Sequence, residues 1–122
     1  DSKQIPGEIS DVMVVKEKTI LEKEFALQQL VDGWYASIEH ISRNLKVSLL
    51  TMAKYEHISY EEFKMAYEGI KTPSRDENKH IFNDTLDDSI SKVNTILLKK
   101  KLVSQKIISK NLYSDQFIKK AN

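Results

Sequence analysis

Three histidines, His40, His57 and His80, are the side chains best suited to acid–base or metal chemistry in a chain that has no cysteine. Glu77 and His80 have the Glu-x-x-His spacing with which di-iron helical bundles hold their metal. Such sites need two of these pairs and two further inward carboxylates, and the sequence supplies one pair at the expected start of a helix. We therefore expect an exposed first helical turn there and no metal site.

Within segment 58–63, Ile58 and Glu62 have the spacing of the Ile at position 8 and the Glu at position 12 of a calcium-binding EF-hand loop. The same alignment puts Ala53 at a position that must supply an oxygen ligand and Glu56 at the position that requires glycine. These mismatches exclude calcium binding. Ser59 and Glu62 instead have the spacing of a capping box, which predicts that a helix begins at this point.

Catalytic and nucleotide-binding motifs are absent from the sequence. It contains three glycines and no glycine-rich phosphate loop, and no nucleophile elbow or zincin motif occurs. The absence of cysteine excludes thiolate catalysis, Cys-ligated zinc and iron–sulfur clusters. We therefore expect a protein that is not an enzyme and that holds no cofactor.

Lys99, Lys100 and Lys101 are the strongest indication of a charged partner. Residues 89–122 hold 8 lysines against 1 acidic residue (8 − 1 = +7), whereas residues 1–88 hold 11 basic against 17 acidic residues (11 − 17 = −6). A lysine-rich helical segment can bind an anionic membrane surface. Nucleic acid is disfavoured, because the segment has no arginine for bidentate contacts with bases. The alternative is that the acidic and basic parts face each other within a bundle.

An apolar stripe at helical spacing is the strongest periodic signal in the chain. Its members follow one another at steps of three and four: Leu27, Val31, Trp34, Ile38, Ile41, Leu45, Ser48, Met52 and Tyr55. We expect four central members to form the apolar seam that binds a partner: Trp34, Ile38, Ile41 and Leu45.

The expected fold is all-α, an elongated antiparallel helical bundle. It has long helices near residues 10–57 and 75–110, a short helix over 59–70 and a short C-terminal turn over 114–120. The apolar residues 12–15 are assigned to the first helix, because no second strand-like segment exists to pair with them.

Gly33 decides between two versions of this bundle. One glycine within a helix costs about 1 kcal/mol relative to alanine, and the apolar stripe keeps its phase across it, so we favour one continuous helix. A break at Gly33 would give a four-helix up–down bundle. Residues 1–7 are expected to be a disordered lead-in and residues 8–122 a single domain.

The functional hypothesis is a non-enzymatic module that binds a protein partner or a second copy of itself through the apolar seam. The first alternative is an extracytoplasmic sensor domain of a membrane receptor, suggested by a first residue other than Met and by the absence of cysteine. The second alternative is a module that binds anionic membranes through its lysine-rich C-terminal half. No apolar segment approaches the roughly 20 residues that span a bilayer.

Overall fold

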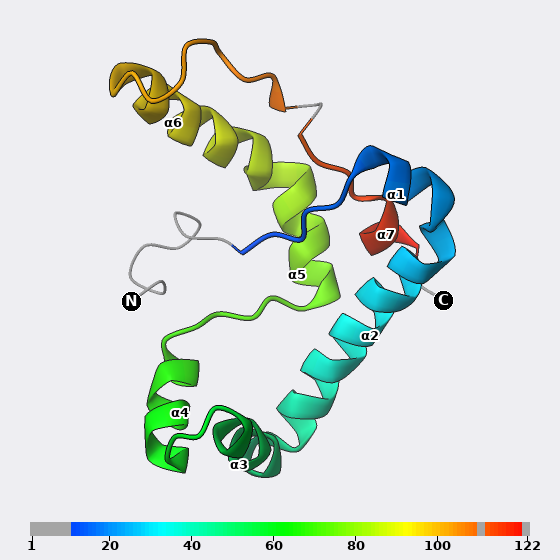
Figure 1. Ribbon diagram of the computed structural model, residues 1–122, viewed down its shortest axis with the longest axis vertical. Helices are drawn as coiled ribbons and strands as arrows, with labels where there is room; N and C mark the ends of the chain where they lie inside the picture. Colours follow the sequence, from blue (N-terminus) through cyan, green and yellow to red (C-terminus); the bar gives the residue numbers. More distant parts are fainter. Residues whose placement is uncertain (1–10, 110–111, 121–122) are drawn as a thin grey trace. The chain divides into compact units, whose positions relative to one another are not determined.

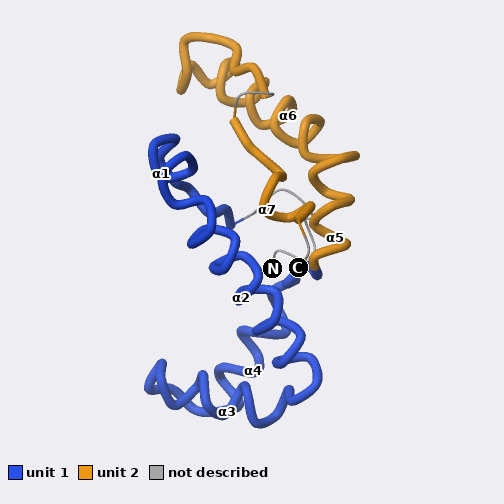
Figure 2. Tube along the Cα trace, turned by 90° about the vertical axis from the view of Figure 1, so that its right-hand side faces the viewer, with its two compact units in different colours: residues 1–74 blue, residues 75–122 orange. Residues whose placement is uncertain are grey.

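The computed structural model describes residues 11–109 and 112–120, and all regular structure within them is helical (Figure 1). The expectation of an all-α fold is therefore confirmed. The expected lead-in, residues 1–7, lies outside the described residues. The chain divides into two compact units, residues 1–74 and 75–122 (Figure 2).

The described part of the first unit contains helices α1 (Glu17–Glu22), α2 (Glu24–Arg43), α3 (Leu45–Tyr55) and α4 (Tyr60–Glu68). The expected single helix over 10–57 is thus interrupted at Lys23 and at Asn44. Residues 11–16 are not helical, so the expected start near residue 10 is also wrong. This segment contains three valines, and β-branched side chains lose rotamer freedom in a helix.

Helix α2 passes through Gly33 without a break, as the phase of the stripe predicted. The interruption falls instead at Asn44, where the backbone N–H and the side-chain Nδ2 both donate to the His40 carbonyl, at 3.0 and 3.1 Å. Asparagine offers the backbone such local alternatives to helical hydrogen bonding. The change of direction between α2 and α3 therefore falls at one polar residue, whose φ of −130° and ψ of 41° lie outside the helical region.

Helix α4 begins at the predicted capping box. The Ser59 hydroxyl accepts the Glu62 N–H at 3.2 Å, and the Glu62 carboxylate accepts the Ser59 N–H at 2.9 Å. Hydrogen bonds from the Ser59 hydroxyl, and then from its backbone N–H, lower the pKa of the Glu62 carboxyl. Helix α4 packs against α3, so the capping box fixes where this packing begins.

The buried positions of α3 differ from those of the predicted stripe. Ser48 is a member of the stripe and is buried. The other two buried residues of α3, Leu49 and Ala53, each lie one position beyond a stripe member. In α2 the stripe members Leu27 and Val31 are buried as expected. The interruption at residue 44 resets the helical phase, and α3 therefore buries a different face.

The described part of the second unit contains α5 (Arg75–His80), a π-helical turn η1 (Ile81–Thr85), α6 (Leu86–Lys99) and α7 (Gln116–Lys119). The long helix expected over 75–110 therefore contains a wide turn and ends early. In η1 the Leu86 N–H donates to the Ile81 carbonyl five residues back. Helix α7 lies within the expected C-terminal turn over 114–120.

Helix α6 ends because Lys101 adopts a left-handed conformation, with φ of 56°. Its N–H donates to the Leu98 carbonyl, and the Leu102 N–H donates to the Leu97 carbonyl, both at 2.9 Å. These two bonds form a Schellman motif, which closes the carbonyl end of a helix. The expectation that this helix continues to residue 110 was wrong for this reason.

Helix α7 packs against α5. The Arg75 guanidinium at the start of α5 donates from Nη1 to the carbonyls of Phe117, Ile118 and Lys120, at 3.4, 3.4 and 3.2 Å. A cation at the C-terminal end of a helix satisfies free carbonyls and suits the helix dipole. The Phe117 side chain is buried, so an apolar contact and a cation together hold this short helix.

Candidate functional site

The interruption at Asn44 creates a concave surface between α2 and α3, here called the α2–α3 groove. It is an open depression of the surface, with a volume of about 480 Å³. The groove is lined by Ala36, Ser37, His40, Ile41, Val47, Ser48, Thr51 and Met52. None of these side chains is a carboxylate, an ammonium or a guanidinium group.

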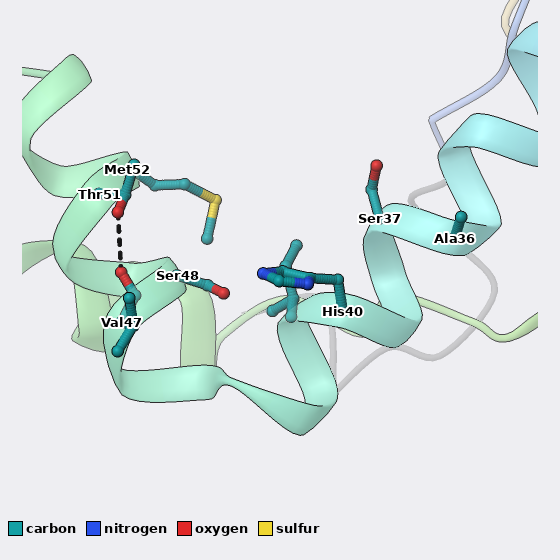
Figure 3. Close-up of a pocket in the computed structure, with 8 residues that line it drawn as sticks. Ala36, Ser37, His40, Val47, Ser48, Thr51 and Met52 are labelled. Carbon is teal, nitrogen blue, oxygen red and sulfur yellow. Dashed lines mark hydrogen bonds between the residues drawn. The ribbon is translucent and has the colours of Figure 1, made fainter.

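Ser48 is the one deeply buried polar residue of this lining, with 9% of its surface exposed. Its Oγ is buried and has no hydrogen-bond partner. Figure 3 shows the Ser48 hydroxyl pointing across the groove toward the imidazole of His40. An unpaired buried hydroxyl costs about 1–3 kcal/mol, and because this oxygen is buried it is not exposed to a ligand in the groove.

The other two hydroxyls of the groove are already engaged as donors. Ser37 Oγ donates to the Gly33 carbonyl at 2.8 Å, and Thr51 Oγ1 donates to the Val47 carbonyl at 2.9 Å (Figure 3 shows the latter as a dashed line). They can still accept a hydrogen bond from a ligand. The exposed His40 imidazole is the remaining polar side chain of the groove, and its ring nitrogens donate or accept according to the tautomer.

A second, polar groove of about 450 Å³ follows one face of α5 and η1, here called the α5–η1 face. It is lined by Asp76, Lys79, His80, Asn83 and Asp84. Lys79 Nζ lies 3.1 Å from Asp76 Oδ1, and His80 Nδ1 lies 2.7 Å from Asp84 Oδ2. Both basic groups are thus paired with carboxylates of the same helical segment.

The residues predicted to bind a partner lie on two helices. Trp34, Ile38 and Ile41 belong to α2, while Leu45 is the first residue of α3. Trp34 is 58% exposed and Leu45 47% exposed. Among the four, Ile41 lines the α2–α3 groove. The assignment of these side chains to a partner contact stays a prediction.

The three predicted lysines mark the end of α6. Lys99 is its last residue, Lys100 is its C-cap and Lys101 is the left-handed residue that follows. All three are exposed. Cations near the last turn stabilise a helix by interaction with its dipole, which gives these lysines a structural reason for their positions.

Sequence reasoning missed that His40 and Ser48 line one groove, because an uninterrupted helix would separate them by two turns along one rod. Two signals for it were present. Ser48 is the one non-aromatic polar member of the apolar stripe, and Asn44 is a poor helix former between two of its members.

Within residues 11–109 and 112–120, no group of three or more histidine or carboxylate side chains is placed to hold a metal ion. His80 contacts Asp84 at 2.7 Å. No helix in this part of the chain is long and apolar enough to cross a membrane.

Comparison with known families identifies the class of protein. The model of the ATP-grasp domain family matches residues 3–115, and the chain therefore belongs to this family. The chain matches no curated protein and no solved structure.

This membership corrects the functional expectation. The sequence motifs predicted a module that is not an enzyme, with partner binding, sensing or membrane binding as its role. The ATP-grasp family is one of ATP-dependent enzymes, so that expectation was wrong. The chain contains no glycine-rich phosphate loop and no familiar catalytic motif, so its short motifs give no sign of this family.

Neither of these two grooves has a lining that fits an ATP–magnesium complex. Magnesium is usually held by one or two carboxylates together with phosphate oxygens, and a triphosphate needs unpaired cations or free backbone N–H groups. On the α5–η1 face, Lys79 and His80 are held by Asp76 and Asp84. The α2–α3 groove has no acidic side chain or permanent cation in its lining.

Proposed function

We propose that this protein takes part in an ATP-dependent reaction of the ligase type, in which the cleavage of ATP is coupled to the joining of two substrates. One observation carries the proposal, namely the family match over residues 3–115 of a 122-residue chain. A match of this extent includes every described helix except α7 (Gln116–Lys119).

ATP binding by the purified chain is the first test. Isothermal titration calorimetry with magnesium and ATP should show saturable binding. GTP serves as the control for recognition of the base, and AMP as the control for recognition of the β- and γ-phosphates. Two-dimensional NMR of the same titration should locate the amides that respond. Absence of both heat and amide shifts at millimolar ATP would overturn the proposal.

ATP consumption is the second test. The released phosphate or pyrophosphate is measured over time with the same protein, with and without magnesium. We expect slow release in the absence of a second substrate, because hydrolysis by water replaces the missing acceptor. Binding of ATP without release of either product, even when candidate acceptors are added, would contradict a ligase-type role.

A further inference from the structure

Residues 112–120, here called the C-terminal strap, lie against the helical segment that contains the π-helical turn η1. Helix α7 within the strap packs against α5 (Figure 2), and Tyr113 contacts Asp87 in α6. The strap is thus attached both before η1 and after it. We propose that the docked strap holds η1 in its π-helical form, and that release of the strap returns residues 81–85 to the α-helical register.

The hydrogen bonds of η1 leave an α-helical alternative within reach. The Leu86 N–H donates to the Ile81 carbonyl five residues back, whereas in an α-helix it would donate to the Phe82 carbonyl. Thr85 lies outside the helical region, with φ of −124° and ψ of −20°, and its hydroxyl also donates to the Ile81 carbonyl, at 3.3 Å. A shift by one residue therefore exchanges one set of backbone hydrogen bonds for another and keeps the segment helical.

Tyr113 contacts two residues that share a face because of the π turn. Its ring packs edge-on against Phe82, with centroids 5.4 Å apart, and its hydroxyl donates to Asp87 Oδ1 at 3.0 Å. In a regular α-helix two residues five positions apart point about 140° away from each other, because each residue turns the helix by about 100°. Hydrogen bonds over five residues place such residues nearly above one another, so one tyrosine reaches both Phe82 and Asp87.

The other end of the strap makes this fit sensitive to the register of η1. Arg75 Nη1 donates to three backbone carbonyls within and just after α7, at 3.2–3.4 Å, and the Phe117 side chain is buried. These contacts fix the strap to α5. In the α-helical register, α6 would turn by about 100° about its axis relative to α5, which carries Asp87 away from Tyr113. A strap docked at both ends therefore requires the π turn.

The strap and the π turn thus form one element with two arrangements. With the strap docked, η1 is π-helical and α6 presents the face that the structure shows. With the strap released, the turn is α-helical and α6 is rotated. Detachment of the C-terminal residues is transmitted to α6 as a rotation, because the register changes by whole residues rather than gradually.

The test is NMR measurement of couplings across hydrogen bonds in the full chain, which identifies the carbonyl that accepts each amide proton. The Leu86 amide should couple to the Ile81 carbonyl in the parent protein and to the Phe82 carbonyl in Tyr113→Ala. Tyr55→Ala is the matched control, because Tyr55 is 78% exposed and lies in the other unit. It should leave the coupling unchanged.

Hydrogen exchange reports the release of the strap in the same variants. The amides of Ile118 and Lys119 donate to the Asp115 carbonyl, both at 3.0 Å, and a helix of four residues is not stable by itself. In Tyr113→Ala these amides should exchange at least about tenfold faster, the effect of losing one hydrogen bond to a charged acceptor. Tyr113→Phe keeps the ring and loses the hydroxyl. If Tyr113→Ala does not fold, this milder variant should still weaken the coupling of Leu86 to Ile81.

Deletion of Asn83 separates the register from the docking. It removes one residue from η1, so that Phe82 and Asp87 become four positions apart and share a face of a regular α-helix. This variant should lose the π-helical bond and keep the slow exchange of the strap. The proposal would be overturned by a Leu86 amide bonded to Phe82 in the parent protein, by an unchanged coupling in the Tyr113 variants, or by faster strap exchange after the deletion.

Discussion

The Tyr113 hydroxyl donates a 3.0 Å hydrogen bond to Asp87 Oδ1 across 26 positions of sequence. The Tyr113 ring also packs edge-on against Phe82, with ring centroids 5.4 Å apart and planes at 82°. Edge-to-face packing of this kind is a favourable aromatic geometry. A single tyrosine thus joins the segment before α7 to both η1 and α6.

This contact should depend on pH. The Asp87 carboxylate, through its hydrogen bond, raises the pKa of Tyr113, with smaller contributions from burial and from the charges of Asp87 and Asp115. Because the phenol is the bonded form, the stabilisation is fully present below pH ~10, the ordinary pKa of tyrosine. It is lost as the pH rises through the raised pKa.

Asp87→Asn should lower the pKa of Tyr113 toward its ordinary value, because the amide carries no charge. Phenolate absorbance reports the titration, and Tyr113→Phe identifies the contribution of this residue among the five tyrosines. Asp88→Asn is the control, since Asp88 is an exposed neighbour on the same helix. An unchanged Tyr113 titration in Asp87→Asn would contradict the assignment.

Gly33→Ala should stabilise the protein by about 0.5–1 kcal/mol, because glycine in the middle of a helix carries an entropic cost. An added Cβ at this position meets no atom within 4 Å, so no clash offsets the gain. Thermal unfolding followed by circular dichroism measures the change. A lower midpoint than that of the parent protein would show that α2 does not pass through Gly33 as a regular helix.

Lys101→Gly should stabilise the end of α6 by about 1 kcal/mol, because a left-handed residue with a Cβ is strained and glycine is not. Lys100→Gly is the matched control. Lys100 is its neighbour in the right-handed region, with φ of −83°, where glycine brings no such relief. Both variants lose one positive charge, so a difference in urea unfolding between them isolates the backbone effect. Equal stabilities would contradict the Schellman ending.

The local elements of the chain were predictable from sequence. The apolar stripe predicted helix through Gly33, and the Ser59–Glu62 spacing predicted the start of α4, because both depend on residues within one or two helical turns. The α4 and α7 segments lay within their expected ranges for the same reason. The class of protein was not predictable in this way, because the family match extends over residues 3–115 and no short motif in that range carries it.

The functional geometry was decided by tertiary structure. A small number of residues set the ends of the helices: Asn44 leaves the helical region, with φ of −130° and ψ of 41°, and Lys101 ends α6 by adopting a left-handed conformation. Periodicity cannot predict either event, because each outcome rests on competition between local hydrogen bonds. The resulting bend places His40 opposite Ser48 and forms the α2–α3 groove. Sequence alone therefore determined that the chain is helical, whereas the folded structure decided which polar side chains face each other.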